Sequence, residues 1–196
     1  TEAYKAACEV EGQKGFPKDL SPRRRTTFVE RISRRFSSVL WLAGCSTPQI
    51  KGVEVHIDVA PGARPRVQQP FPLSEFDQTR LEFHEDLGVA QGKARWADEL
   101  EGSPWGSCSF VVDSDAKGLL GRPVRDYRYV NKQTLDMAWP APSAEACLAR
   151  AQRARYLSLL DCVWGFTQCA VDSETSDLLA LTTRRGMLKP LVLYFG

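Results

Sequence analysis

The sequence predicts a mixed α+β fold, because helix-like and strand-like patterns of apolar residues both occur along it. Between residues 28 and 40, apolar residues recur every four positions, as on one face of an α-helix. Over residues 52–59, apolar and polar residues alternate, as in a strand with one buried face. Two pairs of short apolar runs flank turn residues, which favours β-hairpins. At 196 residues the chain can hold one large domain, with or without an appendage.

The first expected element is an amphipathic helix that follows an irregular extension. Residues 1–25 have no periodic pattern and contain several Gly and Pro residues. Residues 27–30 have the form of a capping box, so the helix should begin there and end near Gly44. The alternating residues 52–59 should then form a half-buried strand.

The middle of the chain predicts a second helix and a hairpin. Ser74 should cap a helix that continues to about Leu87. Its inward-facing apolar residues should be Leu73, Phe76, Leu81 and Leu87. Residues 110–112 and 124–130 should pair as a hairpin around an Asp- and Gly-rich turn.

The last part of the chain predicts a helix, a strand and a second hairpin. Residues 143–155 are rich in Ala and should be helical. The apolar residues 156–160 should form a strand that ends on a carboxylate. Residues 178–183 and 188–195 should pair around a turn at Arg185 and Gly186.

Charge is concentrated near the amino terminus, although the formal net charge of the whole chain is only +2. Residues 21–35 contain six Arg and a single acid, Glu30. One interpretation is a solvated helix face. The other is a surface that contacts phosphates or an assembly partner.

The cysteines favour a reducing, intracellular compartment, without distinguishing cytoplasm, nucleus or organelle. The six Cys include no Cys-X-X-Cys pair, and there are only two His, which argues against a zinc site. Cys162 and Cys169 lie in an apolar region and should be buried thiols. No apolar stretch is long enough to span a bilayer.

The most informative segment comprises residues 156–171, where Leu160, Asp161, Gly165, Phe166 and Gln168 have a distinctive spacing. It resembles the first catalytic motif of reverse transcriptases of gypsy-type (Ty3-like) LTR retrotransposons, which reads Leu-Asp-X-X-X-Gly-Tyr/Phe-X-Gln. Further segments follow the order of motifs in that family, at 53–58, 64–73, 103–107, 126–132, 139–142 and 194–196.

The resemblance implies reverse-transcriptase-like fingers and the first part of the palm. Residues 1–50 would be an amino-terminal extension with the Arg-rich helix. Residues 51–155 would be the fingers-like region, and residues 156–196 a truncated palm.

The same resemblance implies a catalytic carboxylate. Asp161 would be a metal-bridging catalytic residue, and the backbone carbonyl of Cys162 would be a second ligand. The metal would be Mg²⁺, which prefers oxygen ligands, and only an active enzyme would need it. Without the family context, Asp161 would be interpreted as a turn or cap residue.

Four residues would bind the incoming nucleotide in such a family member. Phe166 would exclude a 2′-hydroxyl by packing on the sugar, and Gln168 would lie nearby. Arg122 would pair with the triphosphate, accompanied by Lys117. The alternatives are a core aromatic for Phe166, an exposed polar residue for Gln168 and a solvated hairpin tip for Lys117.

The implied partner is an RNA or DNA primer–template. Arg125, Arg128 and Lys132 would bind nucleic acid by adding positive charge to a template groove.

Several departures from the family pattern bear on function. The second catalytic motif, Tyr-X-Asp-Asp, does not occur in the sequence. Residues 178–181 are Leu-Leu-Ala-Leu where the family has Lys-Thr-Ala-Phe, Lys189 inverts a charge, and Tyr194 replaces a proline. The apolar substitutions predict a face that something else covers, either the remainder of a longer chain or protein partners.

The sequence therefore predicts a reverse-transcriptase-derived domain of a retroelement, incomplete and inactive by itself. Its activity, if present, would be RNA-directed DNA polymerisation by nucleotidyl transfer. The alternative is a non-catalytic, domesticated fragment that serves a larger assembly as a structural subunit or nucleic-acid-binding module.

Overall fold

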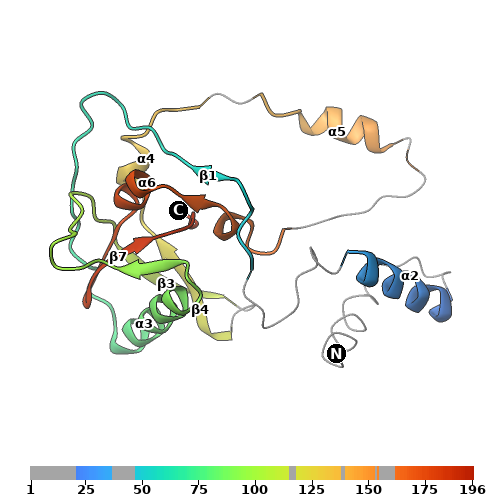
Figure 1. Ribbon diagram of the computed structural model, residues 1–196, viewed down its shortest axis with the longest axis horizontal. Coiled ribbons are helices and arrows are strands. Elements are labelled where there is room, and N and C mark those ends of the chain that lie inside the picture. The colour runs from blue at the N-terminus through green and yellow to red at the C-terminus, as the bar shows by residue number, and fades with distance from the viewer. Residues whose placement is uncertain (1–20, 37–46, 115–117, 138–139, 153, 155–161) are drawn as a thin grey trace. The chain divides into compact units, whose positions relative to one another are not determined.

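The computed structural model describes residues 21–36, 47–114, 118–137, 140–152, 154 and 162–196 (Figure 1). Contacts divide the chain into two units, Thr1–Thr47 and Pro48–Gly196. The second unit combines helices with small sheets, in agreement with the predicted α+β class. The predicted boundary between residues 155 and 156 stays a prediction. None of the helices in the described part of the chain is long and apolar enough to cross a bilayer.

Helix α2 (Pro22–Arg35) is the described helix of the first unit. It begins five residues before the predicted capping box, because Pro22 suits the first turn of a helix. Thr27 is not a cap: its hydroxyl donates to the Arg23 carbonyl from within the helix, at 3.0 Å. The helix ends at Arg35, and the predicted end at Gly44 lies outside the described residues.

Three small sheets form the second unit. The strands are β1 (Glu54–Val55), β2 (Ala94–Trp96), β3 (Ser109–Ser114), β4 (Gly118–Arg125), β5 (Ala170–Val171), β6 (Leu181–Thr183) and β7 (Gly186–Pro190). β2, β7 and β6 lie in that order in an antiparallel sheet, β3 and β4 form an antiparallel hairpin, and β1 pairs with β5 in parallel. Both predicted hairpins are confirmed.

The second unit has four described α-helices, three of which begin at side-chain caps. They are α3 (Glu75–Ala90), α4 (Arg128–Asn131), α5 (Ala144–Ala151) and α6 (Ser173–Leu178), with a 3₁₀ turn η2 (Gly165–Gln168). The predicted cap Ser74 is confirmed, since its hydroxyl accepts from the Asp77 N–H. Ser143 caps α5 in the same way.

Several predicted strands are shorter than expected. The alternating residues 52–59 contribute only the two residues of β1, because its partner β5 has only two residues. β4 ends at Arg125, and residues 128–131 form α4 instead. Residues 173–178 form α6, so that strand β6 starts at Leu181. The sequence did not predict β2, and the predicted strand 156–160 lies outside the described residues.

The hydrophobic core lies around the β2–β7–β6 sheet. Its buried residues are Ala94, Trp105, Tyr127, Val130, Leu178, Leu179, Leu181 and Leu188. The Tyr127 hydroxyl donates to the Leu179 carbonyl at 3.0 Å, and burial raises the pKa of Tyr127. Residues 178–181 therefore fill the core of this unit and do not form an exposed face. Coverage of the truncated palm by protein partners stays a prediction.

Helix α3 packs on the β3–β4 hairpin (Figure 1) and on β2. Three of its four buried residues are polar or charged. Of the four apolar residues predicted to face inward, only Leu81 is buried, while Phe76 is 59% exposed and Leu87 is also exposed. Arg80 is buried instead, and its guanidinium binds the carboxylates of Asp77 and Asp113 at 2.9 and 2.8 Å. This ion-pair network lets a charged side chain occupy the helix–hairpin interface.

Candidate functional site

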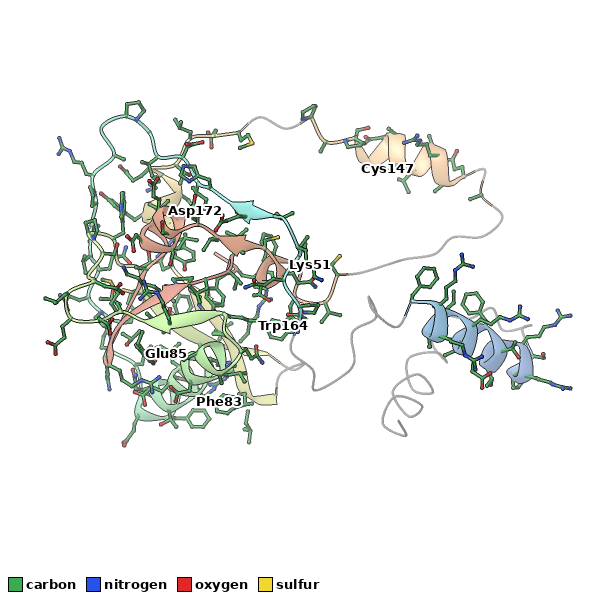
Figure 2. The ribbon with its side chains drawn as sticks, in the orientation of Figure 1. Lys51, Phe83, Glu85, Cys147, Trp164 and Asp172 are labelled. Carbon is green, nitrogen blue, oxygen red and sulfur yellow. The ribbon has the colours of Figure 1, made fainter. Side chains whose placement is uncertain are left out.

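The predicted catalytic segment is described only from residue 162 onward. Asp161 and Lys117 lie outside the described residues, so their predicted roles stay predictions. Cys162 is exposed and Cys169 is partly buried, so the prediction of a buried thiol at Cys162 is wrong. The chain then turns at Trp164, whose φ of 55° is left-handed, into η2 (Figure 2).

Two predicted nucleotide-binding residues contact the same aromatic ring, that of Phe195. The ring centroids of Phe166 and Phe195 are 5.0 Å apart. The guanidinium carbon of Arg122 lies 5.1 Å from the Phe195 centroid. Phe166 is 54% exposed and Phe195 37% exposed, so both rings remain available to a ligand. Arg122, Phe166 and Phe195 are called the aromatic–Arg cluster below.

The residues of this cluster come from three segments, two of which are held together by backbone hydrogen bonds. The Leu193 N–H donates to the Cys169 carbonyl at 3.0 Å, and Val192 bridges to Ala170. These contacts keep the carboxyl-terminal segment beside η2, which brings Phe195 to Phe166. Arg122 reaches the same ring from β4.

Phe195 is the residue whose role sequence reasoning missed. It lies in the Tyr-Phe-Gly segment at 194–196, which had been interpreted only as a landmark of the family. A signal was available, because an aromatic residue near a chain segment rich in apolar residues can pack against another aromatic. Its contact with Phe166, 29 positions away in the sequence, depends on the tertiary fold.

Gln168 closes the turn around η2. Its side-chain amide donates to the Val163 carbonyl at 2.6 Å, and its backbone carbonyl accepts from the Ile50 N–H at 2.7 Å. The side chain is half-buried rather than exposed, and it is hydrogen-bonded to the backbone. The alternative of an ordinary exposed polar residue is therefore wrong. Its proximity to an incoming nucleotide stays a prediction.

The three predicted groove cations do not share one environment. Arg125 is buried, with its guanidinium carbon 4.3 Å from the Tyr194 ring centroid. Arg128 is exposed and binds both carboxylate oxygens of Asp126 at 2.7 Å, which lowers the pKa of Asp126. Lys132 is exposed after α4. Packing thus explains Arg125. Arg128 is exposed but ion-paired with Asp126, whereas Lys132 presents its positive charge to solvent.

A buried lysine, which sequence reasoning also missed, lies next to the η2 segment. Lys93 is 8% exposed, and its ammonium nitrogen lies 5.5 Å from the centroid of the Trp164 ring. Burial lowers the pKa of Lys93. It follows a Gly in a stretch that has no clear periodic pattern, which is why the sequence did not indicate it.

Two other acids near the predicted motif, Asp172 and Asp177, have structural partners. Asp172 caps α6 by accepting from the Thr175 N–H, and it lies 2.5 Å from His56 Nδ1 (Figure 2). This hydrogen bond raises the pKa of His56. Asp177 binds Lys189 at 2.7 Å, so the inverted charge at Lys189 is neutralised within the fold. The described residues contain no group of three or more His, Cys, Asp or Glu side chains that could hold a metal ion.

Comparisons with curated proteins identify similarity to Pol polyproteins. The retrovirus-related Pol polyprotein from transposon 297 of Drosophila melanogaster is 28% identical over 135 residues, which are 67% of this chain and 12% of the relative. A polyprotein of Cassava vein mosaic virus is 26% identical over 129 residues, 65% of this chain and 20% of the relative. The chain thus spans a fifth or less of these relatives. No protein-family profile matches the sequence.

Solved structures with the same fold include protease–reverse transcriptases of foamy viruses. That of prototype foamy virus has a TM-score of 0.74 at 19% identity, over 97% of this chain and 24% of that one. A foamy viral protease–reverse transcriptase in complex with double-stranded DNA has a TM-score of 0.68 at 16% identity, over 98% of this chain and 32% of that one. The chain therefore has a reverse-transcriptase-like α+β fold and is similar to retroviral and retrotransposon Pol polyproteins.

Proposed function

We propose that this chain is the nucleotide-binding part of a reverse transcriptase, an RNA-directed DNA polymerase of a gypsy-type retroelement. The observation that carries the proposal is the aromatic–Arg cluster, in which Arg122, Phe166 and Phe195 meet. A guanidinium suits phosphate oxygens, and exposed aromatic rings suit a sugar or a base. Similarity to Pol polyproteins and the shared fold support the same function. The proposal keeps residues 51–155 as a fingers-like region and 156–196 as a truncated palm, as the motif resemblance implies.

Each residue of the cluster then has a distinct task. Arg122 binds the triphosphate through charge-assisted hydrogen bonds. Phe166 packs against the sugar and leaves no room for a 2′-hydroxyl. Phe195 supports both side chains, since it contacts each of them.

Magnesium is the metal that the proposed chemistry implies. A carboxylate at Asp161 and the Cys162 carbonyl are oxygen donors, which suit Mg²⁺. When bound, the ion neutralises charge on the transferring phosphate. The sequence contains no Asp-Asp pair to complete such a site. We therefore propose that these residues bind a nucleotide but do not polymerise without a carboxylate from another segment or polypeptide.

A nucleic-acid-binding module without catalysis is the second candidate function. The exposed Arg128 and Lys132 favour it, and a structural neighbour is a reverse transcriptase in complex with double-stranded DNA. A role as a structural subunit has less support, because residues 178–181, one of several features that motivated it, are buried in the core of this unit.

Nucleotide binding tests the proposed cluster. Replacing Arg122 by Ala should weaken binding of a deoxynucleoside triphosphate about ten- to a hundredfold, because charge-assisted hydrogen bonds to phosphate are lost. Binding of the matching nucleoside, which carries no phosphate, should not change. Isothermal titration calorimetry with thymidine triphosphate and thymidine measures both. Arg64→Ala, which removes another exposed arginine, is the matched control. An equal loss in the control, or no loss at Arg122, contradicts the proposal.

Primer extension tests the catalytic part. The purified chain is given an RNA template, a DNA primer, Mg²⁺ and deoxynucleotides, beside an Asp161→Asn variant. The expected result is binding of the primer–template without extension. Extension that disappears in Asp161→Asn would show that these residues suffice for catalysis. A chain that binds neither nucleotide nor primer–template would exclude both candidate functions.

A further inference from the structure

We propose that helix α2 is a second nucleic-acid-binding surface, which holds phosphate backbones without reading sequence. Helix α2 contains six arginines and one acid, Glu30, among its 14 residues. None of its residues is buried. This excess of five positive charges lies in the first unit of the chain, whereas the aromatic–Arg cluster belongs to the second.

Three of the six arginines of α2 line a shallow hollow together with an aromatic residue. Arg23, Arg24, Thr27, Phe28 and Arg31 line it. Residues three and four positions apart lie on one face of a helix, which explains why these five side chains come together. Phe28 is 52% exposed within this group.

The dimensions of the basic face match a phosphate backbone. Arg23 and Arg31 are eight residues apart, which is about 12 Å along a helix. One strand of a duplex carries a phosphate about every 3.4 Å along its axis, so that span faces about three or four phosphates. The surface is thus complementary in charge and length to a short run of backbone.

The composition of α2 favours a nucleic acid over a membrane or an acidic protein. A helix that lies in a membrane surface needs a continuous apolar face, but α2 has only Phe28, Val29 and Ile32. Its cations are all Arg, whose planar fork fits phosphate and carboxylate oxygens alike, so the distinction from an acidic protein depends on Phe28. Phe28 among them can stack on an unpaired base.

The proposed contacts are to phosphates, so binding should not depend on base sequence. Arg can also bind guanine edges, and the comparison of unrelated base sequences distinguishes the two cases. Contacts to phosphates position a protein on nucleic acid but carry no sequence information.

Salt-dependent binding tests this surface. The variant Arg23→Gln/Arg24→Gln/Arg31→Gln keeps helix propensity, since Gln and Arg are similar helix formers. Fluorescence anisotropy of the whole chain with labelled single-stranded RNA and duplex DNA, over a range of salt, gives the binding constants. The plot of log K against log[salt] has a negative slope. Loss of three phosphate contacts should reduce the magnitude of that slope by about two to three. The slope should be the same for unrelated base sequences.

Controls separate this proposal from the nucleotide site. The variant Arg64→Gln/Arg66→Gln/Arg150→Gln removes the same number of exposed arginines and should keep the slope. The α2 variant should still bind thymidine triphosphate, and Arg122→Ala should keep the salt slope. An unchanged slope in the α2 variant overturns the proposal. So does α2-dependent binding to phosphatidylserine vesicles or polyglutamate at the affinity measured for nucleic acid.

Discussion

Replacing Gly121 by Ala is expected to destabilise the second unit by about 3 kcal/mol. Gly121 has a φ of +60°, a left-handed conformation that costs an L-residue about 1–2 kcal/mol. A Cβ there would lie 2.7 Å from both Val111 Cγ1 and the Val112 carbonyl oxygen, and it would collide with the Arg80 guanidinium. Overpacking of this kind costs about 1–3 kcal/mol.

Gly92→Ala is the matched control for this prediction. Gly92 has a similar φ of +66°, but a Cβ there would meet nothing within 4 Å. Its substitution should therefore cost only the backbone strain, about 1–2 kcal/mol. Urea denaturation of both variants gives the difference, which isolates the steric clash at Gly121. An equal loss of unfolding free energy in the two variants would contradict the prediction, because the contacts around Gly121 would then add nothing to the backbone strain.

Gly121 also links the stability of the hairpin to the candidate site. It precedes Arg122, and Arg80, which a Cβ would displace, binds Asp113 of β3. A shift of this backbone would move Arg122 away from Phe195. Gly121→Ala should therefore weaken thymidine triphosphate binding even where the variant remains folded.

The sequence could predict those features that depend on neighbouring residues. Ser74 and Ser143 cap helices because a hydroxyl accepts from an N–H three residues ahead, a local contact. The hairpin at residues 185–186 follows from a Gly between two apolar runs, and Gly186 has a φ of +125°. Local geometry decides each of these, so no knowledge of the tertiary fold was needed.

The features that the sequence could not predict depend on partners far along the chain. Arg80 is buried because Asp113, 33 residues away, neutralises it, so the apolar face predicted for α3 is wrong. Lys189 inverts a family charge, yet Asp177 of α6 pairs with it. Phe195 joins the candidate site only because the carboxyl-terminal segment pairs beside η2.

Removing the Arg185 cation is expected to cost about 3–5 kcal/mol, because it leaves a buried carboxylate without its counter-ion. The Glu85 side chain on α3 is 3% exposed, and it accepts from Arg185 at 2.8 Å (Figure 2). Its other oxygen, Oε1, is buried without a hydrogen-bond partner. Arg185 also lies 4.8 Å from the Trp96 ring centroid. The variant Arg185→Met keeps most of the side-chain volume.

Asp86 provides the control for this prediction. It also binds Arg185, at 2.9 Å, but its side chain is 61% exposed. Exposed ion pairs contribute about 0–1 kcal/mol, so Asp86→Asn should have a small effect. A loss at Asp86→Asn as large as that at Arg185→Met would show that burial of Glu85 is not the cause.

The pH dependence of Arg185→Met distinguishes a buried charge from lost packing. Burial raises the pKa of Glu85, and Arg185 opposes that rise. Without Arg185 the folded-state pKa rises further above the unfolded value, so the folded state binds more protons. Its stability is then lost as the pH rises from about 4.5, the ordinary Glu value, through the folded-state pKa. The destabilisation should be larger at neutral pH than in acid, and Glu85→Gln in the same background should remove that pH dependence. A loss that is independent of pH would assign Arg185 to packing on Trp96 instead.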